Sequence, residues 1–286
     1  MAVPLAAVAA ILFGALAVTI RLALRAVADP DAGALVTTAV ACVACIAIAA
    51  VFDQWSHLEW RDTWPFLAVG TVTPGVSQLL FTRAVALIGA SRTTILVGIS
   101  PVLSAAGAIA LLDEPFRVTL AAGTVLVVCG GTLLAWERGG PAGFLTLGVA
   151  LGAAAAVLFS VRDDFVRWSD RGSNVPGVVA AACSLASATA VLTLLVAISG
   201  GGIQRSRAAA KPFLVPGLIY GVAYACLLTA FDGGRVTVVV PLYATESLWA
   251  VVLAAVMLRA AERIGVRVAA AALLVVAGGA LIGGLR

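Results

Sequence analysis

The chain consists almost entirely of apolar runs of about 20 residues, separated by short polar breaks. A helix of that length crosses the hydrocarbon core of a bilayer, where only helices and closed barrels satisfy their backbone groups. The alternating pattern of barrel strands is missing. We therefore predict an all-α integral membrane protein. The expected spans are 3–20, 32–52, 64–83, 91–112, 118–136, 143–161, 174–199, 212–231, 236–258 and 265–285.

The composition excludes the common soluble classes. Hydrophobic residues make up 62% of the 286 residues and charged residues 11%, against about 25% charged residues in a soluble domain. The net charge is +4, but the cations are scattered and form no basic stripe that could follow phosphates. The expected partner is thus the lipid bilayer, and no nucleic acid. Ten spans use roughly 200 residues, which leaves no room for an extramembrane domain.

Enzyme chemistry finds little support in the sequence. The one histidine, His57, lies in a polar connection, and no Gly-rich phosphate loop with a lysine is present. Cys42 and Cys45 can share a helix face, but a metal site would need two further ligands nearby. We expect the five cysteines to pack as small residues. No enzyme activity, metal or cofactor is predicted.

The second half of the chain repeats the first, at an offset of 146 residues that rises to 148 after a two-residue insertion. Matches between charged residues, prolines and glycines are less frequent by chance than matches between apolar residues. Such pairs include Phe13 and Phe159, Arg21 and Arg167, Pro30 and Pro176, Gly75 and Gly221, Glu114 and Glu262, and Gly130 and Gly278. We therefore predict two repeats, 1–138 and 139–286, with five spans each.

An odd number of spans per repeat has a topological consequence. The second repeat must enter the membrane in the opposite sense to the first, so the two repeats are inverted. Many secondary transporters have this plan, with the substrate site near the midplane between the halves. A channel or a membrane enzyme can have the same number of helices, but the inverted duplication favours alternating access.

A family motif appears in the first half. It comprises Phe13-Gly14, Arg83–Val85, Gly89–Ser91, the mid-span Pro101 and the closing run Leu111–Glu114. These segments resemble the signature of the EamA family in the drug/metabolite transporter superfamily. The resemblance implies ten-helix carriers of small metabolites, often exporters of amino acids and related compounds. It also implies a central cavity lined by spans 1, 3, 4, 6, 8 and 9.

The second half carries a weaker copy of this motif, from Gly233 through Ser247–Trp249 to Glu262. Two positions depart from the family pattern. Asp113 replaces the usual glycine before the glutamate, and Ser247 stands where the second repeat often has proline. The resemblance therefore indicates the superfamily and leaves the substrate open.

Glu246 is the most informative single residue, because it lies near the centre of the expected ninth span. A charged group there costs about 2.5–3.5 kcal/mol on insertion scales. We interpret it as a cavity carboxylate that binds a proton or a cationic part of the substrate. The alternative is a structural carboxylate, paired with a hydroxyl or an arginine of a neighbouring helix. Tyr243 and Trp249, three residues to either side, can border the same face.

Gln78 and Tyr224 are equivalent in the two repeats and lie mid-span, in the third and eighth expected helices. Pro74 and Tyr220 form a second equivalent pair, one turn earlier. Polar positions related by the repeat suit a site on the pseudo-two-fold axis. The alternative is that they hydrogen-bond between helices and contribute only to packing.

Charged residues at the span ends are candidates for a gate whose ion pairs form and break. The strongest are Arg162 and Asp163, because they follow an apolar run without a turn; Arg83 is another. The alternative is exposed pairs with little energetic effect. Pro101 and Pro241 interrupt the expected fourth and ninth spans and are candidate hinges, or else static kinks.

Together these features predict a secondary-active exporter of small polar metabolites in the cell membrane, coupled to protons through Glu246. A passive channel or a lipid-handling scramblase is the alternative, because both can use cavities between helices. The small-residue faces Gly130-Gly131 and Gly278-Gly279 would serve helix packing or the surface of a homodimer.

Overall fold

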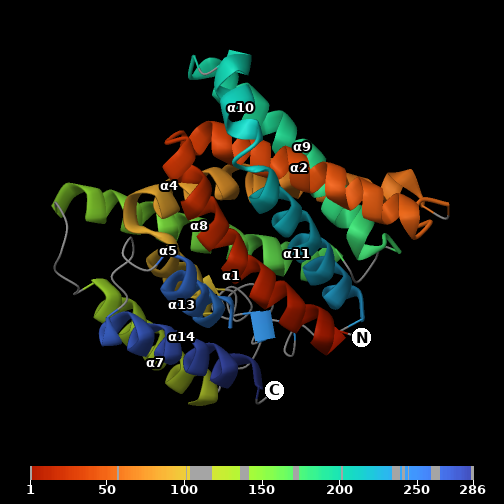
Figure 1. Cartoon of the computed structure of the whole chain (residues 1–286). Helices are drawn as coiled ribbons and strands as arrows, with labels where there is room; N and C mark the ends of the chain where they lie inside the picture. Colours follow the sequence, from red (N-terminus) through yellow and green to blue (C-terminus); the bar gives the residue numbers. More distant parts are fainter. Residues whose placement is uncertain are drawn as a thin grey trace.

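The computed structural model describes residues 2–56, 58–100, 102–103, 118–135, 142–169, 174–200, 202–233, 239, 242–243, 245–258 and 265–284. In this part of the chain the regular elements are all helices, packed side by side (Figure 1). They are α1 Ala2–Ala26, α2 Pro30–Val51, η1 Trp60–Thr63, α3 Trp64–Gly70, η2 Thr71–Val76, α4 Ser77–Ile88, α5 Ala90–Val97, α7 Val118–Ala135, α8 Ala142–Ser169, α9 Gly177–Ile198, α10 Gly202–Ala210, α11 Leu214–Gly233, α13 Glu246–Met257 and α14 Val266–Gly284.

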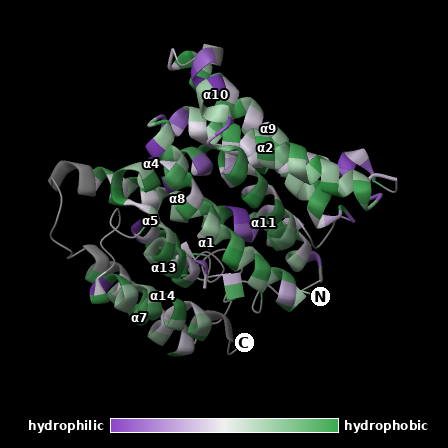
Figure 2. Ribbon diagram, in the orientation of Figure 1, coloured by the Kyte–Doolittle hydropathy of each residue, from purple (hydrophilic) through white to green (hydrophobic). Residues whose placement is uncertain are grey.

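Five stretches of the described chain are long and apolar enough to cross a membrane. They are Ala2–Ala26, Pro30–Val51, Trp60–Ile88, Gly177–Ile198 and Leu214–Asp232. Large apolar side chains also cover much of their outer surface, and Figure 2 shows hydrophobic residues along the outside of the bundle. The all-helical membrane architecture is therefore confirmed at this level. The full set of ten spans stays a prediction.

The third expected span is longer than predicted and is interrupted. It runs from Trp60 to Ile88 instead of 64–83, and Thr73 inside it has a non-helical backbone (φ −141°, ψ 111°). Pro74 follows directly, and its ring lacks the N–H that would continue the helical hydrogen bonds. The interruption bends the chain just before α4, the helix that carries Gln78.

The end predicted for the sixth span is wrong. The helix α8 continues from Ala142 to Ser169, eight residues beyond the expected end at 161. Arg162 and Asp163 therefore lie inside a helix, and both side chains are buried. The predicted span ends at 161 because charged residues such as Arg162 and Asp163 normally mark a solvated connection.

The ninth span also differs from its prediction around Glu246. The helix α13 begins at Glu246, so this residue occupies the first turn of a helix instead of the middle of a continuous one. An acidic residue in the first turn of a helix interacts favourably with the helix dipole. The candidate hinges Pro101 and Pro241 lie outside the described residues, as does His57.

Glycines allow the closest helix contacts, and these contacts come in related pairs. A Cβ on Gly130 of α7 would lie 2.8 Å from the Ala271 carbonyl oxygen of α14. A Cβ on Gly278 of α14 would lie 2.6 Å from the Gly123 carbonyl oxygen of α7. Both partners differ by the repeat offset of 148. These two glycines thus pack α7 against α14 within one chain, as the helix-packing interpretation of them expects.

Glycines also lie at contacts between other helices. A Cβ on Gly221 of α11 would lie 2.9 Å from the Ala41 carbonyl oxygen of α2, and a Cβ on Gly75 of η2 would lie 3.5 Å from Cα of Ala188 on α9. Beyond these contacts, α2 packs on α9, α1 on α11 and α4 on α8. Small residues at these positions let the backbones come close, which is the usual way helices associate in a membrane.

Replacing Gly278 by alanine should destabilise the protein by about 1–3 kcal/mol, because the added methyl group meets backbone of α7 that cannot move aside. The measurement is the thermal unfolding of the purified protein in detergent. Gly265→Ala is the matched control, because no atom lies within 4 Å of a Cβ at that position. Equal melting temperatures for the two variants would contradict the close α7–α14 contact.

Candidate functional site

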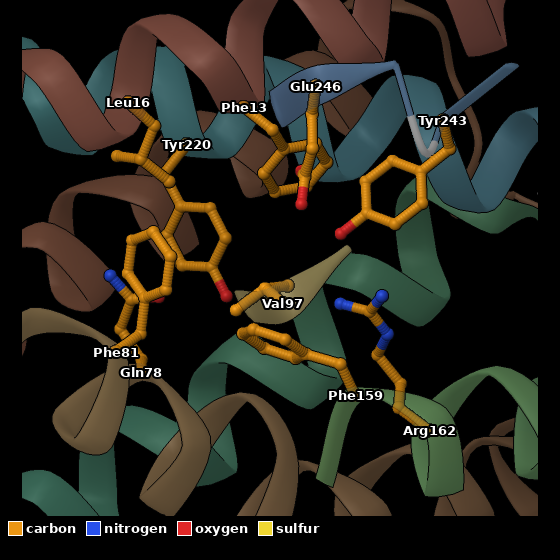
Figure 3. A pocket seen from close by; sticks show the side chains of 10 residues that line it. All are labelled: Phe13, Leu16, Gln78, Phe81, Val97, Phe159, Arg162, Tyr220, Tyr243 and Glu246. Carbon is orange, nitrogen blue, oxygen red and sulfur yellow. The ribbon is translucent and has the colours of Figure 1, made fainter. Parts of the chain in front are cut away.

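A small cavity lies where α1, α4, α5, α8 and α11 meet the start of α13 (Figure 3). Its volume is about 20 Å³, which is room for about one water molecule. A cavity of this size has no room for an organic molecule. The lining residues are Phe13, Leu16, Gln78, Phe81, Val97, Phe159, Arg162, Tyr220, Tyr243 and Glu246.

Arg162 is the most deeply buried charged residue of the cavity, with 1% of its surface exposed. Its Nε and Nη2 atoms both donate to Oδ1 of Asp163, at 2.9 and 2.8 Å. The guanidinium carbon lies 5.0 Å from the ring centre of Phe159 and 5.7 Å from that of Tyr224. A counter-ion and two aromatic faces thus compensate this arginine for the loss of water.

Glu246 faces Arg162 across the cavity and is only 4% exposed. Tyr243 also lines the cavity, and in Figure 3 its hydroxyl lies between the guanidinium of Arg162 and the carboxylate of Glu246. The charged end of each and the hydroxyl point toward the same space in Figure 3. An arginine, a tyrosine and a glutamate from two separate helical segments therefore converge on one point.

Aromatic rings form the remaining walls. The ring of Phe13 meets Tyr220 and Tyr243 edge to face, at centroid distances of 6.1 and 5.3 Å. Phe81 and Phe159 form a similar pair at 6.3 Å. Such walls bind apolar or cationic groups well, and they exclude water from the charges.

Several buried polar atoms at this site have no hydrogen-bond partner within the described part of the chain. They are Nε2 of Gln78 and the hydroxyls of Tyr220 and Tyr224. An unpaired buried polar atom is costly, so it often marks the place of a water or a ligand. Gln78 and Tyr220 both line the cavity, and their free donors can serve a bound molecule.

Most of the candidate residues from the sequence come together here. Gln78, Arg162, Tyr243 and Glu246 line the cavity, and Asp163 is the direct partner of Arg162. Tyr224 is not a lining residue, but its ring contacts both Arg162 and Tyr220. What each residue contributes to function stays a prediction.

Trp249 does not share the cavity, contrary to its expected place beside Glu246. It is 40% exposed and lines an outer, apolar groove of about 420 Å³ between α1 and α13. The reason is the packing of α1: a Cβ on Gly14 would lie 2.8 Å from Cβ of Trp249 and 2.9 Å from the carbonyl oxygen of Glu246. The helix α1 therefore separates the two residues.

Arg83 also lies away from the cavity. Its Nε and Nη2 donate to the two carboxylate oxygens of Asp31 at 2.7 and 2.9 Å. This pair joins the last turns of α4 to the start of α2. At the corresponding place in the second half, Asp232 near the end of α11 accepts from the backbone N–H of Gly177, which begins α9, at 2.6 Å.

Sequence reasoning missed the aromatic and apolar walls, although the repeat carried a signal for them. Phe13 and Phe159 are equivalent at the offset of 146, and both line the cavity. Leu16 and Arg162 are equivalent as well, and both line it too. Equivalent positions of the predicted repeat could thus have been selected as a group.

The cysteines pack against neighbouring helices. Cys45 Sγ on α2 donates to the carbonyl oxygen of Gly221 on α11, at 3.2 Å. Cys42 approaches the carbonyl of Ala182 on α9, at 3.8 Å. Among the described residues no group of histidine, cysteine and acidic side chains is arranged to hold a metal ion.

Replacing Arg162 by methionine should destabilise the fold by about 3–5 kcal/mol, because Asp163 is left buried without its counter-ion. Adding Asp163→Asn to the same variant should recover most of that loss. Thermal unfolding in detergent measures both effects, with Arg207→Met on the exposed face of α10 as the control. A single variant as stable as the wild type would contradict the energetic importance of the pair.

Comparison with known proteins gives two results. Residues 1–136 match the EamA-like transporter family. A crystal structure of a protein with 22% sequence identity superposes with a TM-score of 0.70, over 98% of this chain and 95% of the other. The likeness extends to the whole helical fold. No curated protein sequence matches the chain.

Proposed function

We propose, from the match of residues 1–136 to the EamA-like transporter family, that the chain is a secondary-active transporter. It would export small polar metabolites, such as amino acids or related compounds. It works by alternating access in the cell membrane and is coupled to protons. The observation that carries this proposal is the buried Glu246, which faces Arg162 across a central cavity.

The ten-span inverted repeat is part of the proposal, and paired contacts support it. Gly130 of α7 contacts Ala271 of α14, and Gly278 of α14 contacts Gly123 of α7. The two glycines differ by 148 residues and so do their partners, which is what a two-fold relation between the halves requires. In such a plan the axis passes near the cavity, where a rocking motion opens one side and then the other.

The small volume of the cavity also favours a carrier over an open pore. A channel needs a continuous water-filled path, whereas this site has room for about one water molecule. In a carrier such a closed form is a normal stage, from which the halves separate to admit substrate. A passive facilitator remains the alternative, and it predicts uptake that neither saturates nor responds to a proton gradient.

Glu246 is the proposed coupling group. It is the acidic residue among the described cavity-lining residues, and Arg162 with Asp163, Tyr243, Tyr220 and Tyr224 are the titratable groups around it. A carboxylate in a membrane interior binds a proton readily, because the neutral form needs no hydration. Substrate and proton would then occupy Glu246 in turn.

Glu246→Gln should abolish stimulation of transport by a pH gradient, because the amide cannot exchange a proton. Uptake of a metabolite panel into proteoliposomes is measured with and without the gradient. Asp53→Asn, an exposed change in the connection after α2, is the control. Wild-type rates and pH dependence in Glu246→Gln would contradict the coupling role.

The proposed topology makes a separate prediction. Both termini and the connection between α2 and α3 should lie on one side of the membrane, with α10 and the connection between α1 and α2 on the other. Reporter enzymes that are active on only one side, fused after residues 56, 200 and 286, test this arrangement. Equal activity of the fusions at 56 and 200 would contradict it.

A further inference from the structure

The charges around the cavity add up to a single negative charge. Among the described residues that line it, Arg162 and Glu246 are charged, and Asp163 lies directly against Arg162. Two nitrogens of Arg162 donate to one oxygen of Asp163. Arg162 and Asp163 thus cancel, and the charge of Glu246 remains without a cation of its own.

The other described residues around the cavity do not alter this net charge. The tyrosines at the site, Tyr220, Tyr224 and Tyr243, are neutral at neutral pH. The helices α1, α4 and α5 contribute uncharged side chains, which are Phe13, Leu16, Gln78, Phe81 and Val97.

We propose that Asp163 determines which substrate charge the site accepts: by neutralising Arg162 it leaves a site of net charge −1, which takes either one proton or one monovalent organic cation such as a primary amine. The proposal rests on the transport function above and adds the substrate class. Asp163 acts through Arg162 and is a positioning residue, whereas Glu246 contacts the substrate.

Charge balance distinguishes this class from carboxylates. With a proton or an ammonium group at Glu246 the loaded site is neutral, which suits movement through a region where an uncompensated charge is costly. A carboxylate would have to displace Asp163 from Arg162. It would also bring the site to a charge of −2 while Glu246 is ionised.

The walls fit the same class. Phe13 and its edge-to-face neighbours Tyr220 and Tyr243 stand beside Glu246. Aromatic faces attract organic cations, and the combination with a carboxylate gives an ammonium group both an ionic and a cation–π partner. The rings of Phe159 and Tyr224 already serve Arg162 in that way.

The experiment uses three probes that share a phenyl ring and differ in charge: phenethylamine, phenylalanine and 3-phenylpropionate. Binding to the purified full-length protein in detergent is measured by thermal shift, and proton release by a pH indicator in weak buffer. In the wild type phenethylamine should bind best. At a pH low enough for Glu246 to hold a proton before the amine binds, it should also release about one proton per molecule bound, since both compete for Glu246. 3-Phenylpropionate should bind at least tenfold more weakly and release none.

Two variants test the role of Asp163. Asp163→Asn changes the net charge of the cavity to zero, because Arg162 then pairs with Glu246. The affinity for phenethylamine should therefore fall at least tenfold, and proton release should disappear. Arg162→Gln combined with Asp163→Asn restores the net charge of the cavity to −1. This double variant should therefore regain both the preference for the amine and the proton release. Asp163→Glu, which keeps the charge, should behave like the wild type.

The outcomes separate the inference from the proposed function. Unchanged preference and proton release in Asp163→Asn would overturn the inference, as would loss of the amine preference in the double variant. If Asp163→Asn does not fold, the double variant and Asp163→Glu still decide. Transport of the three probes into proteoliposomes is measured alongside binding. A wild type that binds phenethylamine but transports none of the probes would count against the transport function alone, while a wild-type preference for 3-phenylpropionate would overturn the inference alone.

Discussion

An arginine buried in the interior of a membrane protein is the constraint on which the rest of this structure depends. Arg162 needs a counter-ion, aromatic faces and a dry environment at once, and Asp163, Phe159 and Tyr224 supply them. These partners fix where α8 and α11 must meet. The cavity lies beside that meeting point, so its shape follows from how one charge is compensated.

Much of the fold was predictable because lipid leaves few options. Apolar runs of spanning length gave the approximate places of α1, α2, α9, α11 and α14, since a bilayer thickness sets the length of such runs. The wrong end of the sixth span has a clear physical cause. The sixth span was ended at Arg162 because charges normally mark a connection, but two charges that pair with each other can continue a helix inside the bundle.

The candidate site was predictable in part for the same reason. Glu246, Gln78 and Tyr243 attract notice because polar groups are costly in lipid, whereas Phe13 and Phe159 look like any other apolar residue. Trp249 shows the limit of spacing arguments. Trp249 is three residues from Glu246, so the two are expected on the same side of a helix. The close approach of α1 at Gly14 lies between them, so Glu246 lines the inner cavity and Trp249 lines the outer groove.

Pro74 and Tyr220 stand at equivalent positions of the duplication, and the difference between them has a mechanical meaning. Around Pro74 the helical hydrogen bonds are broken at Thr73, whereas α11 runs through Tyr220 without interruption. The first half of the chain therefore has an interrupted helix at the position where the second half has a continuous one. Bending is easier where a helix is interrupted than where it is continuous, so the two halves of the chain differ in stiffness at positions that correspond in sequence.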